Sequence, residues 1–241
     1  MAISLGGADF SGIYVGNTEV SEVYSGSNLV WSSSASFVGA VTDSDETSVD
    51  NLSFDISGLV STGDLCVLSI TSDRRLDTPN VTVDGMTSTV TSLYPFNGSS
   101  PGQALYYWFS DASDPTTITL TSTSNDGGGL TGVCSIYRRV ATFENSSQDY
   151  AVSGMPSPPS LVAGSATQLI VLVGCLDDDA VPVTAPSGYT MSGQISINPP
   201  SGAISTTMVA HKLTTANVTE NPAAFSGAGN DQWVAYTLRF S

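Results

Sequence analysis

The sequence repeats itself at two scales, and this repetition limits the fold more than any other feature. At the short scale, residues 13–20 (IYVGNTEV) and 23–31 (VYSGSNLVW) form a tandem with apolar residues around each Tyr-x-Gly element. At the long scale, the rest of the chain divides into two units, 35–140 and 141–241, whose apolar runs follow in the same order. A duplicated unit behind a small repeated arm indicates a part that assembles with others.

Each unit is a series of short runs rich in β-branched and aromatic residues, separated by clusters of Gly, Pro, Asn and Asp. This pattern is typical of an all-β sandwich. We predict an all-β fold with little helix, made of an arm of small hairpins (1–34) and two tandem jelly-roll-like β-sandwich lobes (35–140 and 141–241). In the first lobe the expected strands are 36–41, 52–56, 65–72, 80–83, 87–93, 103–109, 116–122 and 131–139.

Matching runs keep one order in the two units, which indicates duplication despite low identity. The matches are Leu65–Leu68 with Leu169–Leu172, Val83–Thr87 with Pro186–Thr190, Tyr106–Phe109 with Ala210–Leu213, Asp114–Pro115 with Asn221–Pro222, and Gly132–Arg138 with Trp233–Arg239. The proline-rich segment 155–159 is expected to be extended rather than the centre of a strand, because proline cannot donate to a ladder.

The charge and the hydropathy of the chain argue against two classes of partner, nucleic acid and membrane. There are 22 acidic and 6 basic residues, for a net charge of −16. Nucleic acid is excluded as a main partner, because neutralising phosphates needs clustered Lys and Arg. A membrane span is not expected, because the chain has no apolar run of sufficient length. The three cysteines lack a metal-binding or disulfide spacing, so we expect Cys66, Cys134 and Cys175 to be buried core residues.

The residues offer little for catalysis. His211 is the only histidine, and no nucleophile elbow or partner motif accompanies it. The acidic clusters 177–179 and 43–46 suggest either solvated turns or a Ca²⁺ site, and less readily a pair of glycosidase carboxylates. We therefore expect no enzyme activity, no cofactor and no catalytic or structural metal, and leave a cation at the acidic loops open.

Aromatic residues in polar loops are the remaining candidates for contact with a partner. Tyr94, Phe96 and Tyr189 lie in Gly-, Ser- or Pro-containing segments. Such rings either stack on sugars and anchor interfaces or tuck back over the core. They are predicted as surface contacts, with the second arrangement kept open.

The arm resembles N-terminal segments of tailed-bacteriophage virion proteins, which carry a tandem of the type I-Y-x-G-x-x-x-V and V-Y-x-G-x-x-x-V-W. The body resembles β-sandwich domains of the same proteins through four cues: G-D-L before an apolar strand (Gly63–Leu65), G-x-T (Gly188–Thr190), a Tyr-Tyr strand (Tyr106-Tyr107), and a closing strand that ends in Arg. The second unit departs from the pattern, since Gln168-Leu169 replaces G-D-L. Proteins with these features are minor tail, tail-fibre or head-decoration proteins.

The resemblance implies a non-enzymatic structural protein of the virion, assembled in the host cytoplasm. Its arm is expected to dock on other virion proteins, and the predicted docking residues are Tyr14, Gly16, Tyr24, Gly26 and Trp31. A homo-oligomer is expected, with a trimer favoured, because several short arms bind better together. A tail-fibre or minor tail protein that contacts a host-surface glycan is favoured, with a capsid decoration protein as alternative and a glycan-active tail enzyme as the weakest reading.

Overall fold

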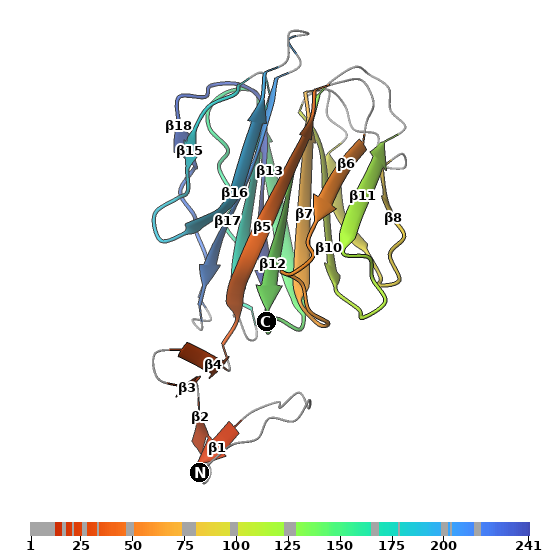
Figure 1. The fold of residues 1–241 in the computed structure, drawn as a ribbon. Helices are drawn as coiled ribbons and strands as arrows, with labels where there is room; N and C mark the ends of the chain where they lie inside the picture. Colours follow the sequence, from red (N-terminus) through yellow and green to blue (C-terminus); the bar gives the residue numbers. More distant parts are fainter. Residues whose placement is uncertain are drawn as a thin grey trace.

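The computed structural model describes residues 13–15, 18–20, 22–25, 28–32, 34–46, 51–73, 81–96, 101–122, 129–164, 169–177, 179–198, 202, 204–214 and 218–241. Every regular element in these residues is a β-strand (Figure 1). The strands are β1 (Ile13–Val15), β2 (Thr18–Val20), β3 (Glu22–Ser25), β4 (Asn28–Ser32), β5 (Ser36–Asp45), β6 (Asn51–Asp55), β7 (Leu65–Ser72), β8 (Val81–Asp84), β9 (Thr91–Phe96), β10 (Gly102–Phe109), β11 (Thr117–Ser122), β12 (Leu130–Arg138), β13 (Phe143–Ala151), β14 (Leu169–Asp177), β15 (Val183–Thr184), β16 (Thr190–Ile197), β17 (Ser205–Leu213), β18 (Ser226–Gly227) and β19 (Trp233–Phe240). The all-β prediction is confirmed.

Strands β5 to β12, here called lobe 1, form a two-layered sandwich. One layer is a five-stranded antiparallel sheet with the order β5-β12-β7-β10-β9, and the other is a three-stranded sheet with the order β6-β11-β8. The core between them is apolar and includes Leu52, Phe54, Cys66, Trp108 and Ile136. The jelly-roll description stays a prediction, since the eight strands divide here into five and three.

Strands β13 to β19, here called lobe 2, repeat the strand order of the large sheet. That sheet has the order β13-β19-β14-β17-β16. When the five strands of each large sheet are numbered along the chain, both sheets have the spatial order 1-5-2-4-3. The outer layer is reduced. In the described residues it consists of the pair β15-β18 and a single bridge between Leu161 and Glu220. Segment 155–159, where three prolines stand, contains no strand, as predicted.

The two large sheets pack face to face, so the lobes share one core (Figure 1). Strand β7 shows how the sequence allows this arrangement. Leu65 and Val67 point into the shared core, whereas Cys66 and Leu68 point into the core of lobe 1. A strand that is covered on both faces needs a continuous apolar run rather than an alternating one, and Leu65–Ser72 is buried throughout. Whether residues 35–140 and 141–241 are separate folding units stays a prediction.

The predicted cysteine environment is confirmed. Cys66, Cys134 and Cys175 are all buried and free. Burial raises the pKa of the Cys134 and Cys175 thiols to about 12 and raises that of Cys66 well above its usual range. Since the thiolate is the reactive form, these cysteines serve as packing residues.

One sequence match between the lobes needs a correction. The sequence aligned the closing strands so that Arg138 matched Arg239. In the structure Ile136 pairs with Cys66, the second residue of β7, and Arg239 pairs with Ile170, the second residue of β14. Arg239 is therefore equivalent to Ile136. The shift of two residues keeps every side chain on the same face, which is why apolar alternation alone did not reveal it.

The arm forms two small antiparallel hairpins, as predicted. Ile13 pairs with Val20 in the first hairpin, and Val23 pairs with Trp31 in the second, which also has a register shift after Val23. Figure 1 shows both hairpins beyond the end of the body at which β5 begins. We call this end of the body the arm-proximal end. Gly16 and Gly26 lie outside the described residues.

Candidate functional site

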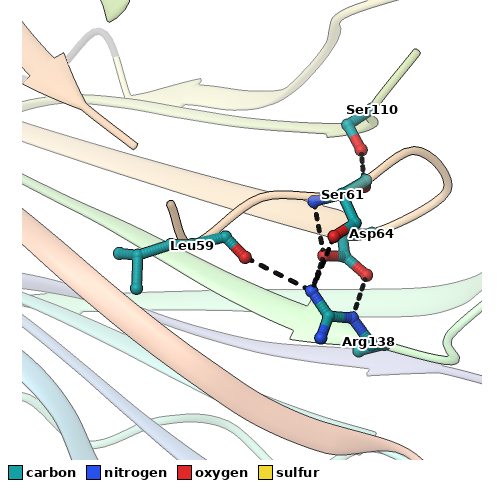
Figure 2. Close-up of polar contacts among 5 residues, drawn as sticks. All are labelled: Leu59, Ser61, Asp64, Ser110 and Arg138. Carbon is teal, nitrogen blue, oxygen red and sulfur yellow. Dashed lines mark hydrogen bonds and ion pairs between the residues drawn. The ribbon is translucent and has the colours of Figure 1, made fainter. Parts of the chain in front are cut away.

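Two of the cues that carried the family resemblance meet in lobe 1. Asp64 immediately precedes β7, and Arg138 is the last residue of β12. The Arg138 guanidinium binds the Asp64 carboxylate through two hydrogen bonds (Figure 2). Arg138 Nε donates to Asp64 Oδ1 at 3.0 Å, and Nη2 donates to Oδ2 at 2.8 Å. The carboxylate raises the pKa of Arg138, chiefly through this hydrogen bonding. The Asp64 side chain is 3% exposed and that of Arg138 is 39% exposed, so the pair lies at the boundary of core and solvent.

The same guanidinium holds the loop between β6 and β7. Arg138 Nη2 also donates to the Leu59 carbonyl at 3.3 Å and to Ser61 Oγ at 3.0 Å (Figure 2). The Ser61 amide donates to Asp64 Oδ2 at 2.8 Å, which closes a tight turn. Gly63 has a φ of 85°, a left-handed value that favours glycine. The G-D-L sequence thus forms a turn, and its aspartate is bound by Arg138 of the closing strand.

Ser110, which follows β10, fastens a second loop to this turn. Its hydroxyl donates to the Ser61 carbonyl at 2.5 Å (Figure 2). Its amide donates to the Asp64 carbonyl at 2.9 Å, and its carbonyl accepts from the Gly63 amide at 2.8 Å. Loops 56–64 and 110–116 are therefore held against each other by polar contacts on both main chains.

Asp114 organises loop 110–116 from the other side. Its carboxylate accepts hydrogen bonds from the backbone amides of Asp111, Thr87 and Ser88. It also accepts from the hydroxyls of Thr87 and Ser88, and the five distances range from 2.5 to 3.0 Å. Partial burial opposes ionisation, but the hydrogen bonds from Ser88, the Asp111 amide and Thr87 outweigh it and lower the pKa of Asp114 to about 2. Asp114 is thus a fully ionised structural carboxylate whose lone pairs are in use.

A cavity of about 250 Å³ lies between these two fixed loops. We call it the Trp108 pocket. It has an apolar floor and a hydroxyl- and carboxylate-bearing rim, and its lining residues are Ile56, Val60, Ser61, Thr62, Trp108, Ser110, Asp111, Ala112, Asp114, Pro115 and Thr116. Asp111 and Thr62 are exposed, so the rim is open to solvent. Trp108 is 1% exposed, and its indole Nε1 is buried without a hydrogen-bond partner in the described residues.

In lobe 2 the strand position equivalent to Trp108 is occupied by Lys212. Trp108 pairs with the second residue of β7, and Lys212 pairs with the second residue of β14. Lys212 Nζ donates to both carboxylate oxygens of Glu220, at 2.9 and 3.0 Å. Tyr189 completes this cluster, because its hydroxyl donates to Glu220 Oε2 at 3.0 Å and Lys212 Nζ lies 5.7 Å from its ring centre. Burial, followed by the negative charge of Glu220, raises the pKa of Tyr189.

Arg239 joins two segments that lie over the outward face of the large sheet of lobe 2. It is fully buried, where lobe 1 has Ile136. Its guanidinium donates to the carbonyls of Val162, Leu161 and Val218, which lie in two coil segments. In lobe 1 the corresponding segments are strands β6 and β11, which satisfy each other by ladder pairing. In the described residues the two segments of lobe 2 pair only at the Leu161–Glu220 bridge, and the buried arginine binds further carbonyls of both.

His211 is packed between the lobes, not presented at a cleft. Its ring stacks on Phe37 at 4.6 Å and meets the edge of Tyr137 at 5.6 Å. Nδ1 is 2.8 Å from Ser192 Oγ, which is also 3.1 Å from the Tyr137 hydroxyl. Burial lowers the pKa of His211. In the described part of the chain none of these partners is a carboxylate, so the contact with Ser192 lacks the acid that orients a hydrolase triad.

The predicted contact residues are not brought together. Tyr14, Tyr24 and Trp31 lie in arm strands, and Tyr94 and Phe96 lie in β9 at the end of the body away from the arm. Their side chains are outside the described residues. Tyr189 is half-buried and tucked onto Lys212 and Glu220, which is the second of the two arrangements considered for it.

The acidic clusters were expected as turns, but Asp43 lies within strand β5 and Asp177 is buried at the end of β14. Asp43 accepts from the amides of Ser44 and Ser53, and Asp179 accepts from that of Asn230. No group of three or more potential metal ligands gathers among the residues that the structure describes. No helix in that part of the chain is long and apolar enough to cross a membrane.

Sequence reasoning missed the Trp108 pocket. Its two loops are 46 or more residues apart in sequence, and they meet through the contacts of Ser110, for which the sequence has no motif. Comparison of the chain with protein-family models, with curated proteins and with solved structures returned no match.

Proposed function

We propose that this chain is a non-enzymatic structural protein of a tailed-phage virion, docked by its N-terminal arm and exposed on the particle as a tail-fibre or minor tail protein. The observation that carries the proposal is the pair of tandem hairpins, which stand outside a body whose two lobes already share one core. Short hairpins bury too little surface to be stable alone, so a tandem of them is suited to bind a partner surface. The resemblance of the tandem to phage virion proteins supplies the class of partner.

The body supports a scaffold role through the uses of its reactive residues. His211 is stacked between rings, the cysteines are buried, and Asp64 and Asp114 hold turns. Each of these groups has a structural use that accounts for its position. Other virion proteins, a host-surface glycan and further copies of this chain, as a trimer, are the proposed partners.

A capsid decoration protein is the second candidate, and one observation favours it. A protein that bridges capsid subunits needs apolar contacts on its sides. In the described residues the large exposed apolar side chains all belong to lobe 2, and they are Tyr150, Val152, Val162, Leu213 and Val218. Val162 and Val218 lie together at the arm-proximal end, since their carbonyls accept from the same guanidinium. This placement suits lateral packing close to the site of docking.

Labelling of intact particles tests the proposal. Antibody fragments against the body should decorate the tail in electron micrographs of the phage that encodes the chain, and decoration over the head would select the second candidate. A variant with Tyr14→Ala, Tyr24→Ala and Trp31→Ala should fold normally and yet be missing from particles. The matched control is His211→Gln, which should be incorporated. Particles that carry no copy of the full-length chain would contradict the proposal.

A further inference from the structure

We propose that the face shared by the two lobes also joins copies of this chain, so that lobe 1 of one copy packs on lobe 2 of a second copy. Such an exchange forms the contacts of the shared core between chains instead of within one chain. Each lobe has a further apolar core on its outward face, which includes Phe54 in lobe 1 and Phe225 in lobe 2. A lobe therefore keeps one core intact while it changes partner. The inference rests on the proposed homo-oligomer and names the surface that forms it.

The first argument is strain in the segment that joins the lobes. Segment 139–142 links the end of β12 to the start of β13, and Arg139 in it has a φ of 61°. Arg139 is the one non-glycine residue with a positive φ in the part of the chain that the structure describes. This left-handed conformation is costly for a residue with a Cβ, and it persists only where the surroundings impose it.

Both neighbours of Arg139 are held in place. Arg138 is bound to Asp64 on one side, and Val140 is buried in the shared core on the other. The closed arrangement of the two lobes therefore imposes the conformation of Arg139. A chain whose lobes pack on another copy does not have to adopt it, so exchange relieves the strain.

The second argument is the length of the segment. Tyr107 of β10 stacks on Phe143 of β13 at 5.0 Å, so β13 begins opposite β10. Strand β10 is the second neighbour of β12 in the large sheet of lobe 1, which places it about 10 Å to the side, and packed sheets lie about 10 Å apart. The segment therefore covers about 14 Å, whereas the chain from Arg138 to Phe143 reaches roughly 17 Å at full extension. Closure within one chain leaves little slack.

The polar part of the shared face determines how the lobes of two copies must pair. Thr71, Thr131 and Thr207 are fully buried there. The Thr207 hydroxyl of lobe 2 lies 2.8 Å from that of Thr131 and donates to that of Thr71 at 2.6 Å. Buried hydroxyls are costly without partners, so an exchanged face must restore the same pairing of lobe 1 with lobe 2. Copies then join in a closed ring in which each shared face is complete.

The oligomeric state of the purified full chain tests the role of segment length. Wild type refolded from urea at about 0.1 mM should contain exchanged oligomers, although a short flexible linker gives an effective concentration of millimolar order, at which monomers would persist. Deletion of Ala141 shortens the reach to roughly 14 Å and leaves no slack, so this variant should be almost wholly dimeric or trimeric by light scattering. Insertion of two glycines after Arg139 restores slack and should give monomers at the same concentration.

Substitutions of Arg139 test the role of strain. Arg139→Gly accepts a positive φ without strain, so closure within one chain becomes about fivefold more favourable for each linker. The dissociation constant of an exchanged dimer should therefore rise about 25-fold, because two linkers relax. The matched control is Arg139→Ala, which removes the charge but keeps the Cβ and thus the strain, and its dissociation constant should equal that of wild type.

A disulfide across the shared face shows whether an oligomer is held by exchange. The Thr71 and Thr207 hydroxyls are 2.6 Å apart, so Thr71→Cys combined with Thr207→Cys should give a disulfide on oxidation. Cys175, which also contacts Thr71, belongs to lobe 2 as well, so either pairing links the two lobes. The bond lies within one chain in a closed monomer, whereas in an exchanged oligomer it joins chains and gives covalent dimers or trimers on a non-reducing gel.

Any of the following outcomes overturns the inference: wild type that stays monomeric after refolding, a folded variant without Ala141 that is monomeric, equal dissociation constants for Arg139→Gly and Arg139→Ala, or oligomers with only intrachain disulfides. If the deletion variant fails to fold, the two Arg139 variants and the disulfide still decide. Particle labelling is a separate test. Wild type found on particles as single copies refutes exchange, whereas an exchanging chain that is absent from particles refutes only the virion proposal.

Discussion

Removing Arg138 should destabilise lobe 1 by about 2 kcal/mol. Loss of one partner of a fully buried ion pair costs about 3–5 kcal/mol, whereas exposed pairs contribute about 0.2–1 kcal/mol. The pair here is intermediate, because Asp64 is 3% exposed and Arg138 is 39% exposed. Arg138→Ala leaves the Asp64 carboxylate with the Ser61 amide and removes the donor to the Leu59 carbonyl. For a chain of this length, about 2 kcal/mol corresponds to a fall in Tm of roughly 4–8 °C.

A double-mutant cycle separates the pair from its surroundings. Urea unfolding of Asp64→Ala, Arg138→Ala and the double variant should give a coupling energy of about 1.5 kcal/mol. Arg138→Lys should recover less than half of the loss, because a lysine cannot grip both carboxylate oxygens. Arg139→Ala is the matched control, since Arg139 is exposed, and its free energy of unfolding should change by less than about 0.5 kcal/mol. A coupling energy near zero would refute the view that Asp64 and Arg138 act as a unit.

Three further predictions concern stability. Burial lowers the pKa of His211 and so favours its neutral form in the folded protein. The contribution of His211 to the free energy of unfolding is therefore complete above pH about 6.5 and is lost as the pH falls through the lower pKa of the folded state. The urea midpoint of wild type should drop more steeply below pH about 6.5 than that of His211→Gln. Asp114 has a pKa lowered to about 2, so its contribution to the free energy of unfolding is present above pH about 4 and is lost as the pH falls to about 2. Asp114→Asn, at a partly exposed site, should lower the free energy of unfolding by about 1 kcal/mol at pH 7 and make acid unfolding less steep. An unchanged acid-unfolding profile would contradict this. Gly132→Ala should destabilise the protein by about 1–3 kcal/mol, because the new Cβ would lie 2.5 Å from Phe54 Cζ. The control is Gly39→Ala, whose Cβ would meet only the flexible end of the Leu59 side chain at 3.2 Å. An equal fall in Tm for the two variants would exclude overpacking as the cause.

Much of the fold follows from local sequence patterns. The run Leu65–Ser72 was expected as a strand and is one, because a continuous apolar run between turns has few alternatives in a chain without helical periodicity. Strand ends follow less closely from local patterns. The strand expected at 87–93 lies at Thr91–Phe96, since pairing with β10 rather than local propensity decides where it begins.

Properties that depend on distant contacts could not be derived in this way. The face-to-face packing of the large sheets depends on which of two apolar faces of β7 meets which neighbour, and both faces are equally apolar. The reduced outer layer of lobe 2 depends on Arg239, a charged residue that local patterns place at a surface. The Trp108 pocket depends on two loops that lie far apart in the sequence, and local patterns carry no signal that they meet.

The faces shared by the two lobes and the faces turned outward obey different constraints. At the shared face, Tyr107 of lobe 1 stacks on Phe143 at 5.0 Å and meets the edge of Phe240 at 5.7 Å. His211 occupies the equivalent position in lobe 2 and repeats this geometry with Phe37 and Tyr137, at 4.6 and 5.6 Å.

Matched ring triads on both sides are what a duplicated unit paired with itself would leave, although the duplication stays a prediction. On the outward faces the equivalent positions differ in kind, with Ile136 and Trp108 in lobe 1 against Arg239 and Lys212 in lobe 2. A close-packed shared core tolerates little change, whereas an outer layer can exchange apolar packing for charge pairs. Differences between the lobes should therefore be sought on their outward faces, where lobe 2 has the Lys212–Glu220 pair and lobe 1 has a cavity between loops 56–64 and 110–116.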